Sequence, residues 1–223
     1  MTKKAISILI FTIMSFSNLS ASDGEVIPLV EPQKTGGMPL LEALDNRQSM
    51  RSYSQEALSD QDLSNLLWAA FGVNREDGRR TAPTARNWLQ FDIYVIMADG
   101  WYRYDAEKHA LIRGGTEDLR EFAGTQDFAR EAPVNLIFVS DHDRMRGADR
   151  AKRDFNSATD VGFISQNVYL FCASEGLATV VRGMVDREKL HEVLKLRSAQ
   201  HVILGQSVGY PAQEKTPPAW RGL

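Results

Sequence analysis

The chain has 223 residues and a formal net charge of −3 at pH 7. This length suits one domain, or one domain with a short arm, and an apolar fraction of 43% is enough for a hydrophobic core. The small negative charge and the scattered basic residues exclude a general electrostatic attraction to nucleic acid or to an anionic membrane surface.

The first 22 residues have the layout of a secretory signal peptide. A basic start, MTKK, precedes the apolar run AISILIFTIMSF, and the small residues of SNLSAS follow. This run is shorter than the roughly 20 apolar residues that a membrane-spanning helix needs, which favours cleavage over retention as an anchor. We therefore expect an exported, periplasmic protein that is cleaved after Ser22, with cleavage after Ala21 as the alternative.

Beyond the signal peptide, residues 23–38 contain Pro and paired Gly without periodicity and are expected to form an N-terminal arm. Residues 39–46 are expected to form a short helix with three leucines on one face. The next helix is predicted to begin at the capping residue Ser59 and to end at Gly72. Its apolar residues recur at helical spacing, at Leu63, Leu66, Leu67, Ala70 and Phe71.

The rest of the chain alternates strand patterns with helical patterns. The apolar run at 134–140 is almost continuous, which predicts a strand buried on both faces. This order of elements predicts one α+β domain over residues 39–223, with a mixed or antiparallel central sheet flanked by helices. The expected strands are 91–97, 101–105, 134–140, 177–181 and 201–210, and the expected helices are 116–131, 156–175 and 186–194.

The residue types that usually carry catalysis form no recognisable constellation. Cys172 is the single cysteine, so an intramolecular disulfide is excluded, and its apolar surroundings predict a buried side chain rather than a reactive thiol. The four histidines lack metal-ligand spacing, and no metal site is predicted. There is also no P-loop, hydrolase elbow or dinucleotide-binding glycine motif. An enzyme with this sequence would therefore take its chemistry from a cofactor.

The stretch RQSMRSY, residues 47–53, is the most informative local feature. In an extended segment the side chains of Arg47, Ser49 and Arg51 point to the same side. Arginine offers a planar fork of donors that matches phosphate oxygens, and serine adds a short hydroxyl donor. One phosphate could contact all three side chains, although alternating Arg and Ser also suits a solvated turn.

Four segments, in order along the chain, resemble the nitroreductase-like family of FMN-dependent oxidoreductases. RQSMRSY resembles the family's R-x-S-x-R segment, and APTARNWLQFDIYVI resembles its P-S-x-x-N-x-Q-P-W segment. DVGFISQNVYLFCASEGLATVVRGMVD resembles its long central helix with the strand that follows, and SVGYP resembles its late G-x-P turn. The resemblance covers residues 39–221 and implies the nitroreductase-like fold.

The resemblance also implies FMN, bound without a covalent bond at the interface of a homodimer. The R-x-S-x-R residues would bind the phosphate and ribityl chain, and Asn87 would hydrogen-bond the flavin ring region. The backbone of residues 181–183 would face the ring edge near N5, and Arg221, or less well Lys215, would close on the phosphate. The implied cofactor-binding residues are Arg47, Ser49, Arg51, Asn87, Val181, Arg182, Gly183 and Arg221. No side chain is assigned a catalytic role, because flavin N5 carries the chemistry, but Arg182 could add positive charge beside the ring.

Three departures from the family pattern bear on the substrate. Thr84 replaces the usual Ser, the residues after Gln90 lack Pro-Trp, and Arg182 stands where many members carry Glu. These features resemble the branch that contains the peptide azoline dehydrogenases. They leave open nitro or quinone reduction and dehydrogenation of a small organic molecule or a peptide.

Taken with the signal peptide, these features lead us to expect an exported FMN-dependent oxidoreductase. Because nicotinamide cofactors belong chiefly to the cytoplasm, an exported enzyme would more readily pass electrons to oxygen or to a quinone-type acceptor. Two other classes stay open at this point. One is a flavin- or ligand-binding module of the same fold without turnover, and the other is a structural surface protein whose Arg/Ser segment is only solvated.

Overall fold

The structure, a computed structural model, describes residues 24–212. Within this range, seven strands form one sheet in the order β1-β4-β3-β2-β5-β7-β6, and every neighbouring pair is antiparallel. The predicted α+β class is therefore confirmed, with an antiparallel sheet. The predicted signal peptide, residues 1–22, lies outside the described residues. The strands are β1 (Val26–Pro28), β2 (Phe91–Met97), β3 (Gly100–Asp105), β4 (Ala110–Gly115), β5 (Val134–Asp141), β6 (Ala178–Arg182) and β7 (Gln200–Gly209).

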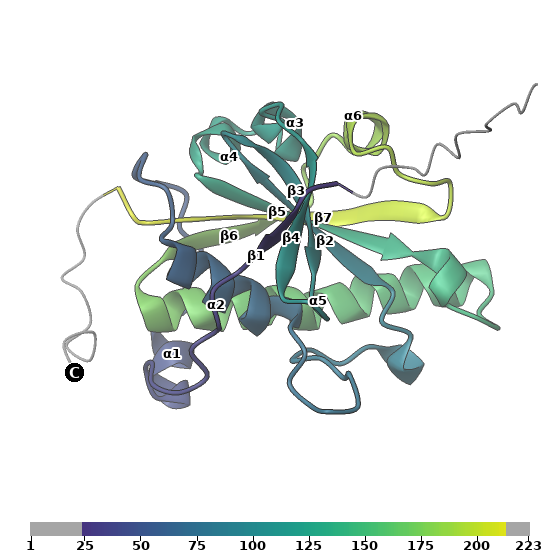
Figure 1. Cartoon of the computed structure of the whole chain (residues 1–223), viewed down its shortest axis with the longest axis horizontal. Helices are drawn as coiled ribbons and strands as arrows, with labels where there is room; N and C mark the ends of the chain where they lie inside the picture. Colours follow the sequence, from purple (N-terminus) through teal and green to yellow (C-terminus); the bar gives the residue numbers. More distant parts are fainter. Residues whose placement is uncertain (1–23, 213–223) are drawn as a thin grey trace, which may run out of the picture.

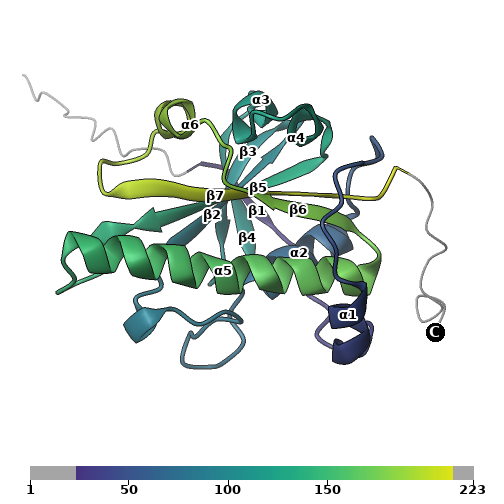
Figure 2. The same cartoon turned by 180° about the vertical axis from the view of Figure 1, so that it is seen from behind.

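Helices cover both faces of this sheet (Figure 1). The long helix α5 and the helices α1 and α2 lie on one face, and the short helices α3, α4 and α6 lie on the other. In the view from behind, α5 runs along the whole length of the sheet (Figure 2). The helices are α1 (Leu40–Asn46), α2 (Asp60–Phe71), α3 (Arg120–Ala123), α4 (Asp127–Glu131), α5 (Arg150–Glu175) and α6 (Arg187–Val193), with 3₁₀ turns η1 (Ala85–Asn87) and η2 (His142–Arg144).

Helix ends follow the capping signals in the sequence. The Ser59 hydroxyl accepts a hydrogen bond from Asp62 N at 3.0 Å, and α2 ends at Gly72 as predicted. Asp149 caps α5 by accepting from Lys152 N at 2.9 Å. At the other end Gly176 adopts a left-handed conformation with φ of 70°, which stops the helix before β6 begins.

Apolar side chains fill the space on each face of the sheet. β5 is buried along its whole length, as its continuous apolar run predicts. Leu66 of α2 and Ile164 of α5 are fully buried against one face, and Leu190 of α6 is fully buried against the other. Cys172 is also buried, in agreement with the sequence, and burial raises the pKa of its thiol.

Four elements differ from their sequence-based predictions. Strand β1 lies within residues 23–38, which the sequence predicts only as an arm. The sequence does not predict β4, because its ALIRGG segment ends in two glycines, which are weak strand formers. The helix predicted over 116–131 is divided into α3 and α4, because Gly124 takes an extended conformation between them. Helix α5 begins six positions before the predicted start at 156, because Asp149 caps a first turn that has no apolar periodicity.

Candidate functional site

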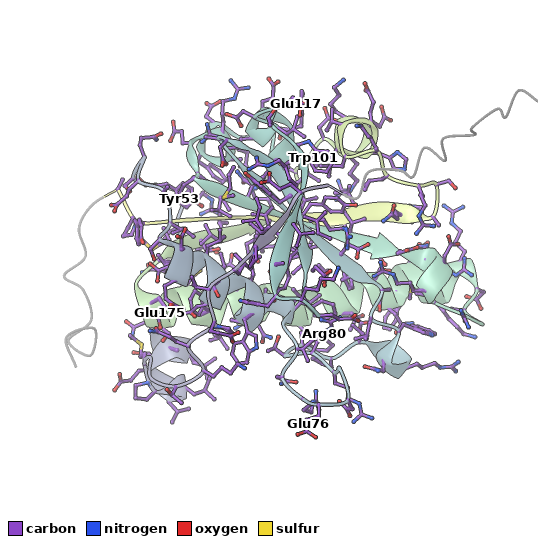
Figure 3. All side chains as sticks on the ribbon, viewed as in Figure 1. Tyr53, Glu76, Arg80, Trp101, Glu117 and Glu175 are labelled. Atoms are coloured by element: carbon purple, nitrogen blue, oxygen red, sulfur yellow. The ribbon has the colours of Figure 1, made fainter. Side chains whose placement is uncertain are left out.

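Residues 47–54, which contain the Arg/Ser stretch, run along the free edge of β6 at one end of the sheet. Met50 N donates to Thr179 O of β6 at 2.9 Å, and Ser54 N donates to Tyr210 O at 2.8 Å. Tyr53, in the same segment, lies at the end of the sheet near the last described residues (Figure 3). These main-chain bonds hold the segment as an extended chain, the conformation in which alternate side chains share one side.

Tyr169, a residue of α5, joins the Arg/Ser segment to the strand β6. Its hydroxyl lies 2.8 Å from the Ser49 hydroxyl and accepts a hydrogen bond from Val181 N at 3.0 Å. The Arg47 guanidinium lies over the Tyr169 ring, 5.2 Å from its centroid. Three residues that the family resemblance assigns to FMN are therefore brought together by one buried side chain. The sequence does not single out Tyr169, since it reads as one more apolar position of a long helix.

Two arginines of this segment keep their positive charge available. Arg47 is half-buried and Arg51 is exposed. Within residues 24–212, neither forms an ion pair with a carboxylate. A doubly charged phosphate would meet both guanidinium groups and the Ser49 hydroxyl with no competing anion, so this donor set fits a phosphate.

The backbone of residues 181–183 offers one free donor. Val181 N–H is bonded to Tyr169, and the alternation along β6 directs the Arg182 amide to β7, where Arg182 is paired with Gly205. No described residue accepts a hydrogen bond from Gly183 N–H. Gly183 is exposed, and a Cβ atom added there would meet nothing within 4 Å. A flat ring can therefore approach the Gly183 amide closely.

The side chain of Arg182 does not lie where the sequence analysis expected it. Side chains alternate along a strand, and this one points to the α3/α4 side of the sheet, where it is 4% exposed. Its guanidinium donates to Ala123 O, and also to Asn135 Oδ1 at 2.6 Å. Burial lowers the pKa of Arg182 to about 10. This placement gives Arg182 a role inside the protein, and the expected charge beside the flavin ring has no support from the geometry.

Asn87 lies away from the Arg/Ser segment. It ends η1, which is held to α5 because Ala85 N donates to Asp160 Oδ2 at 2.8 Å. Asp160 and Tyr169 are nine positions apart, or about two and a half helical turns, so they project from opposite sides of α5. A single protomer therefore does not bring Asn87 next to Arg47 and Ser49. Arg221 and Lys215 lie outside the described residues.

The loop that carries Asn87 holds an unusual backbone conformation. Arg86, Asn87 and Leu89 have positive φ angles of 51°, 54° and 48°. Such conformations cost energy in residues other than glycine and persist where the surroundings enforce them, often at functional sites. Asp160 enforces this one, because its Oδ2 also accepts from Gln90 Nε2 at 2.8 Å.

Large apolar side chains are exposed on α1 and on the outer side of α5. Leu41 of α1 is 78% exposed, and Phe155 and Phe163 of α5 are 70% and 45% exposed. The three leucines predicted on one face of α1 are thus turned outward, and Ala43 is its buried residue. Exposed apolar groups of this size on neighbouring helices are typical of a surface that another protein covers.

Two other kinds of site are not found in the part of the chain that the structure describes. Residues 24–212 contain no group of three or more His, Cys, Asp or Glu side chains that could hold a metal ion. None of the helices in this range has the length and apolar character needed to cross a membrane.

The sequence matches the model of a known family over most of its length. The family model described as "Nitroreductase family" matches residues 44–210, a range that includes the Arg/Ser segment, α5 and β6. The chain belongs to the nitroreductase family. The fold is that of nitroreductases, as the resemblance implies.

Individual members of the nitroreductase family agree with this assignment. A nitroreductase-like protein of Methanocaldococcus jannaschii is 34% identical over 170 residues, which cover 71% of this chain and 85% of that protein. The FMN reductase [NAD(P)H] of Bacillus subtilis is 25% identical over 187 residues, covering 78% of this chain and 66% of its own length. The crystal structure of a nitroreductase-like protein from Ralstonia eutropha has a TM-score of 0.81 and 42% identity, and the match covers 86% of this chain and 92% of that one.

Proposed function

We propose that this nitroreductase family member is an FMN-dependent oxidoreductase that acts on a small organic molecule or a peptide. FMN, when bound, supplies a ring nitrogen, N5, that accepts or gives up a hydride. The observation that carries the proposal is the meeting of Arg47, Ser49 and Val181 at Tyr169. The name of the B. subtilis relative, FMN reductase, supports the choice of cofactor.

The Arg/Ser segment would hold the phosphate end of FMN. Arg47 and Arg51 supply permanent positive charge, and Ser49 supplies a hydroxyl donor between them. Main-chain bonds to β6 and Tyr210 fix this segment before the cofactor binds, so little ordering entropy opposes binding. The single Arg/Ser set favours FMN over FAD, because FAD would need room for a second phosphate and an adenosine.

The Gly183 amide would face the ring edge. A backbone N–H at this place would donate a hydrogen bond to N5 of the oxidised ring, the atom that would take up the hydride. The exposed glycine leaves the room that a flat ring needs. Val181 N–H cannot act in this way, since Tyr169 already accepts from it.

A homodimer would complete the site. The outer side of α5 carries Phe155 and Phe163, and Gly162 beside them would let a second helix come close, because a Cβ there would meet nothing within 4 Å. We propose that a two-fold axis across this surface brings Asn87 of one protomer toward the Arg/Ser segment of the other.

The dimer is tested by replacing an exposed phenylalanine with a charge. We expect Phe163→Asp to give a monomer in sedimentation and to lose FMN, whereas Val30→Asp, on a comparably exposed residue of the N-terminal arm, should leave both unchanged. A Phe163→Asp protein that stays dimeric would contradict the use of this surface.

Export to the periplasm is part of the proposal and rests on residues 1–22. An exported enzyme would reoxidise its flavin with oxygen or a quinone-type acceptor and act as a dehydrogenase. Fractionation of cells that express the full chain tests this directly, and a full-length, uncleaved protein in the cytoplasm would contradict it.

The central experiment is an absorption spectrum of purified residues 23–223, with release and identification of any yellow cofactor. We expect close to one FMN per chain. Arg47→Ala/Arg51→Ala should bind FMN about 100-fold more weakly, because two charge-assisted contacts are lost. Arg150→Ala is the matched control, since this arginine is 94% exposed at the far end of α5. A folded, colourless protein that takes up no added FMN would overturn the proposal, and one that binds FMN without any electron transfer would be a binding module.

A further inference from the structure

The hydroxyl of Tyr169 contacts two segments that are far apart in the sequence. It lies 2.8 Å from Ser49 Oγ in the Arg/Ser segment and 3.0 Å from Val181 N at the end of β6. The Tyr169 side chain comes from the buried side of α5, and the residue as a whole is 7% exposed. Its position is therefore set by the packing of the core and not by solvent.

The protons of these three groups can be assigned. Val181 N–H is a donor only, so the Tyr169 oxygen accepts from it. The phenol has a single proton, and among the described residues its other hydrogen-bond partner is Ser49. A buried phenol proton without an acceptor would be costly, so Tyr169 donates to Ser49. The Ser49 oxygen is thus an acceptor toward the protein interior, and its own proton points away from Tyr169.

This assignment turns an ordinary serine into an oriented donor. A free serine hydroxyl rotates and can present either its proton or its lone pairs to a ligand. With Tyr169 donating to it, Ser49 presents its proton to the outside, where an anion accepts it. Arg47 is oriented by the same residue, because its guanidinium rests over the tyrosine ring, a contact that consumes none of its N–H donors.

We propose that Tyr169 is a positioning residue for the phosphate group of the bound flavin, acting through Ser49 and Arg47 and not by contact with the cofactor. The inference rests on the proposed function, since it needs FMN in this site. It assigns the recognition of phosphate, as distinct from the flavin ring, to a hydroxyl on the long helix. It also predicts that Tyr169 contributes to the preference for FMN over riboflavin, which has the same ring and ribityl chain but no phosphate.

The test compares the dissociation constants of FMN and riboflavin, measured by quenching of flavin fluorescence on the apoprotein. For Tyr169→Phe we expect FMN to bind about tenfold more weakly while riboflavin binds as in the wild type, because a hydrogen bond to a charged group is worth more than one to a neutral group. Adding Tyr169→Phe to Ser49→Ala should weaken FMN binding by much less than tenfold, because the oriented hydroxyl is already absent.

A matched control separates positioning from general damage. Tyr104→Phe removes another buried tyrosine hydroxyl, on β3, which is hydrogen-bonded to His109 Nδ1 at 2.9 Å, and it should change neither constant. Equal weakening of FMN and riboflavin by Tyr169→Phe would show a structural role only and would overturn the inference. So would unchanged binding of FMN.

Failure of the proposed function and failure of the variant to fold can be distinguished from failure of the inference. If the wild-type protein takes up no FMN, the proposed function fails before Tyr169 is tested. If Tyr169→Phe does not fold, Ser49→Ala carries the test alone, because Ser49 is exposed and its truncation removes no buried apolar side chain. A wild-type ratio of FMN to riboflavin affinity in Ser49→Ala would then overturn the inference.

Discussion

Helix α5 supports two functional segments, and it holds them by different chemistry. Tyr169, a neutral phenol, holds the Arg/Ser segment of residues 47–54 through hydrogen bonds to Ser49 and to β6. Asp160, a buried carboxylate that is 3% exposed, holds the loop of residues 84–90 through two donors. Hydrogen bonds to a charged acceptor are the stronger kind, and the loop that they hold is the one with strained backbone angles. The difference indicates that each anchor is matched to the strain of the segment it holds.

The largest expected effect comes from breaking the carboxylate anchor. Asp160→Ala would leave Ala85 N–H and the Gln90 side chain without their acceptor, and we expect it to lower the free energy of unfolding by about 3 kcal/mol. Urea denaturation of the apoprotein measures this. Asp160→Asn, which keeps one acceptor oxygen, should lose clearly less, and equal losses in the two variants would contradict this expectation, because a neutral amide oxygen would then not replace the carboxylate.

A smaller, pH-dependent effect on stability should distinguish the two ends of α5. His142 packs against the first half of the helix, with Nε2 at 3.3 Å from Ser157 Oγ. Burial, with a contribution from His201, lowers the pKa of His142 below its ordinary value of 6.5. The unfolded chain therefore binds more protons than the folded chain as the pH falls below 6.5, so stability should decrease there.

Hydrogen exchange at pH 7.5 and pH 5.5 would locate this loss. Intrinsic amide exchange slows as the pH falls, so the rates are compared as protection factors. We expect lower protection at pH 5.5 than at pH 7.5 around Ser157 and little difference around Tyr169. His142→Asn should make the fall in stability shallower. A uniform loss along α5 would contradict the distinction between its ends.

The smallest effect on stability is expected at Gly183. A Cβ atom there meets nothing within 4 Å, so Gly183→Ala should change the free energy of unfolding by less than about 0.5 kcal/mol. The added methyl group would, however, lie against a ring placed on the Gly183 amide, and FMN should bind more weakly, by about fivefold. Unchanged affinity for FMN would show that the ring does not approach this residue.

Much of the fold could be predicted because its signals are local. The cap at Ser59, the alternation of β2 and the continuous apolar run of β5 each depend on neighbouring residues, and all three elements are found where the sequence predicts them. β4 could not be predicted, because its pairing with β1 and β3 comes from distant residues and its own glycines argue against a strand.

The candidate site likewise contains residues that local sequence signals reveal and residues that only distant contacts define. The Arg/Ser segment could be identified from the sequence, because the side chains of alternate residues in an extended chain point to the same side. Tyr169 could not be identified in this way, because its role comes from the packing of α5 against β6. Nothing in the sequence of the helix distinguishes its hydroxyl from that of any other buried tyrosine. The direction of the Arg182 side chain was missed because strand alternation gives two faces without saying which face meets the cofactor.

The covered edge of β6 has a further consequence, for solubility. An uncovered edge strand offers unpaired N–H and C=O groups that can template aggregation with another chain. Here Met50 donates to Thr179 O, and Tyr169 accepts from Val181 N, so two of the outward backbone groups of β6 already have partners. The opposite edge is β1, which has three residues and ends in Pro28. Both edges of the sheet are thus protected, and at β6 the segment that would carry the cofactor-binding side chains also helps to protect the protein from forming β-aggregates.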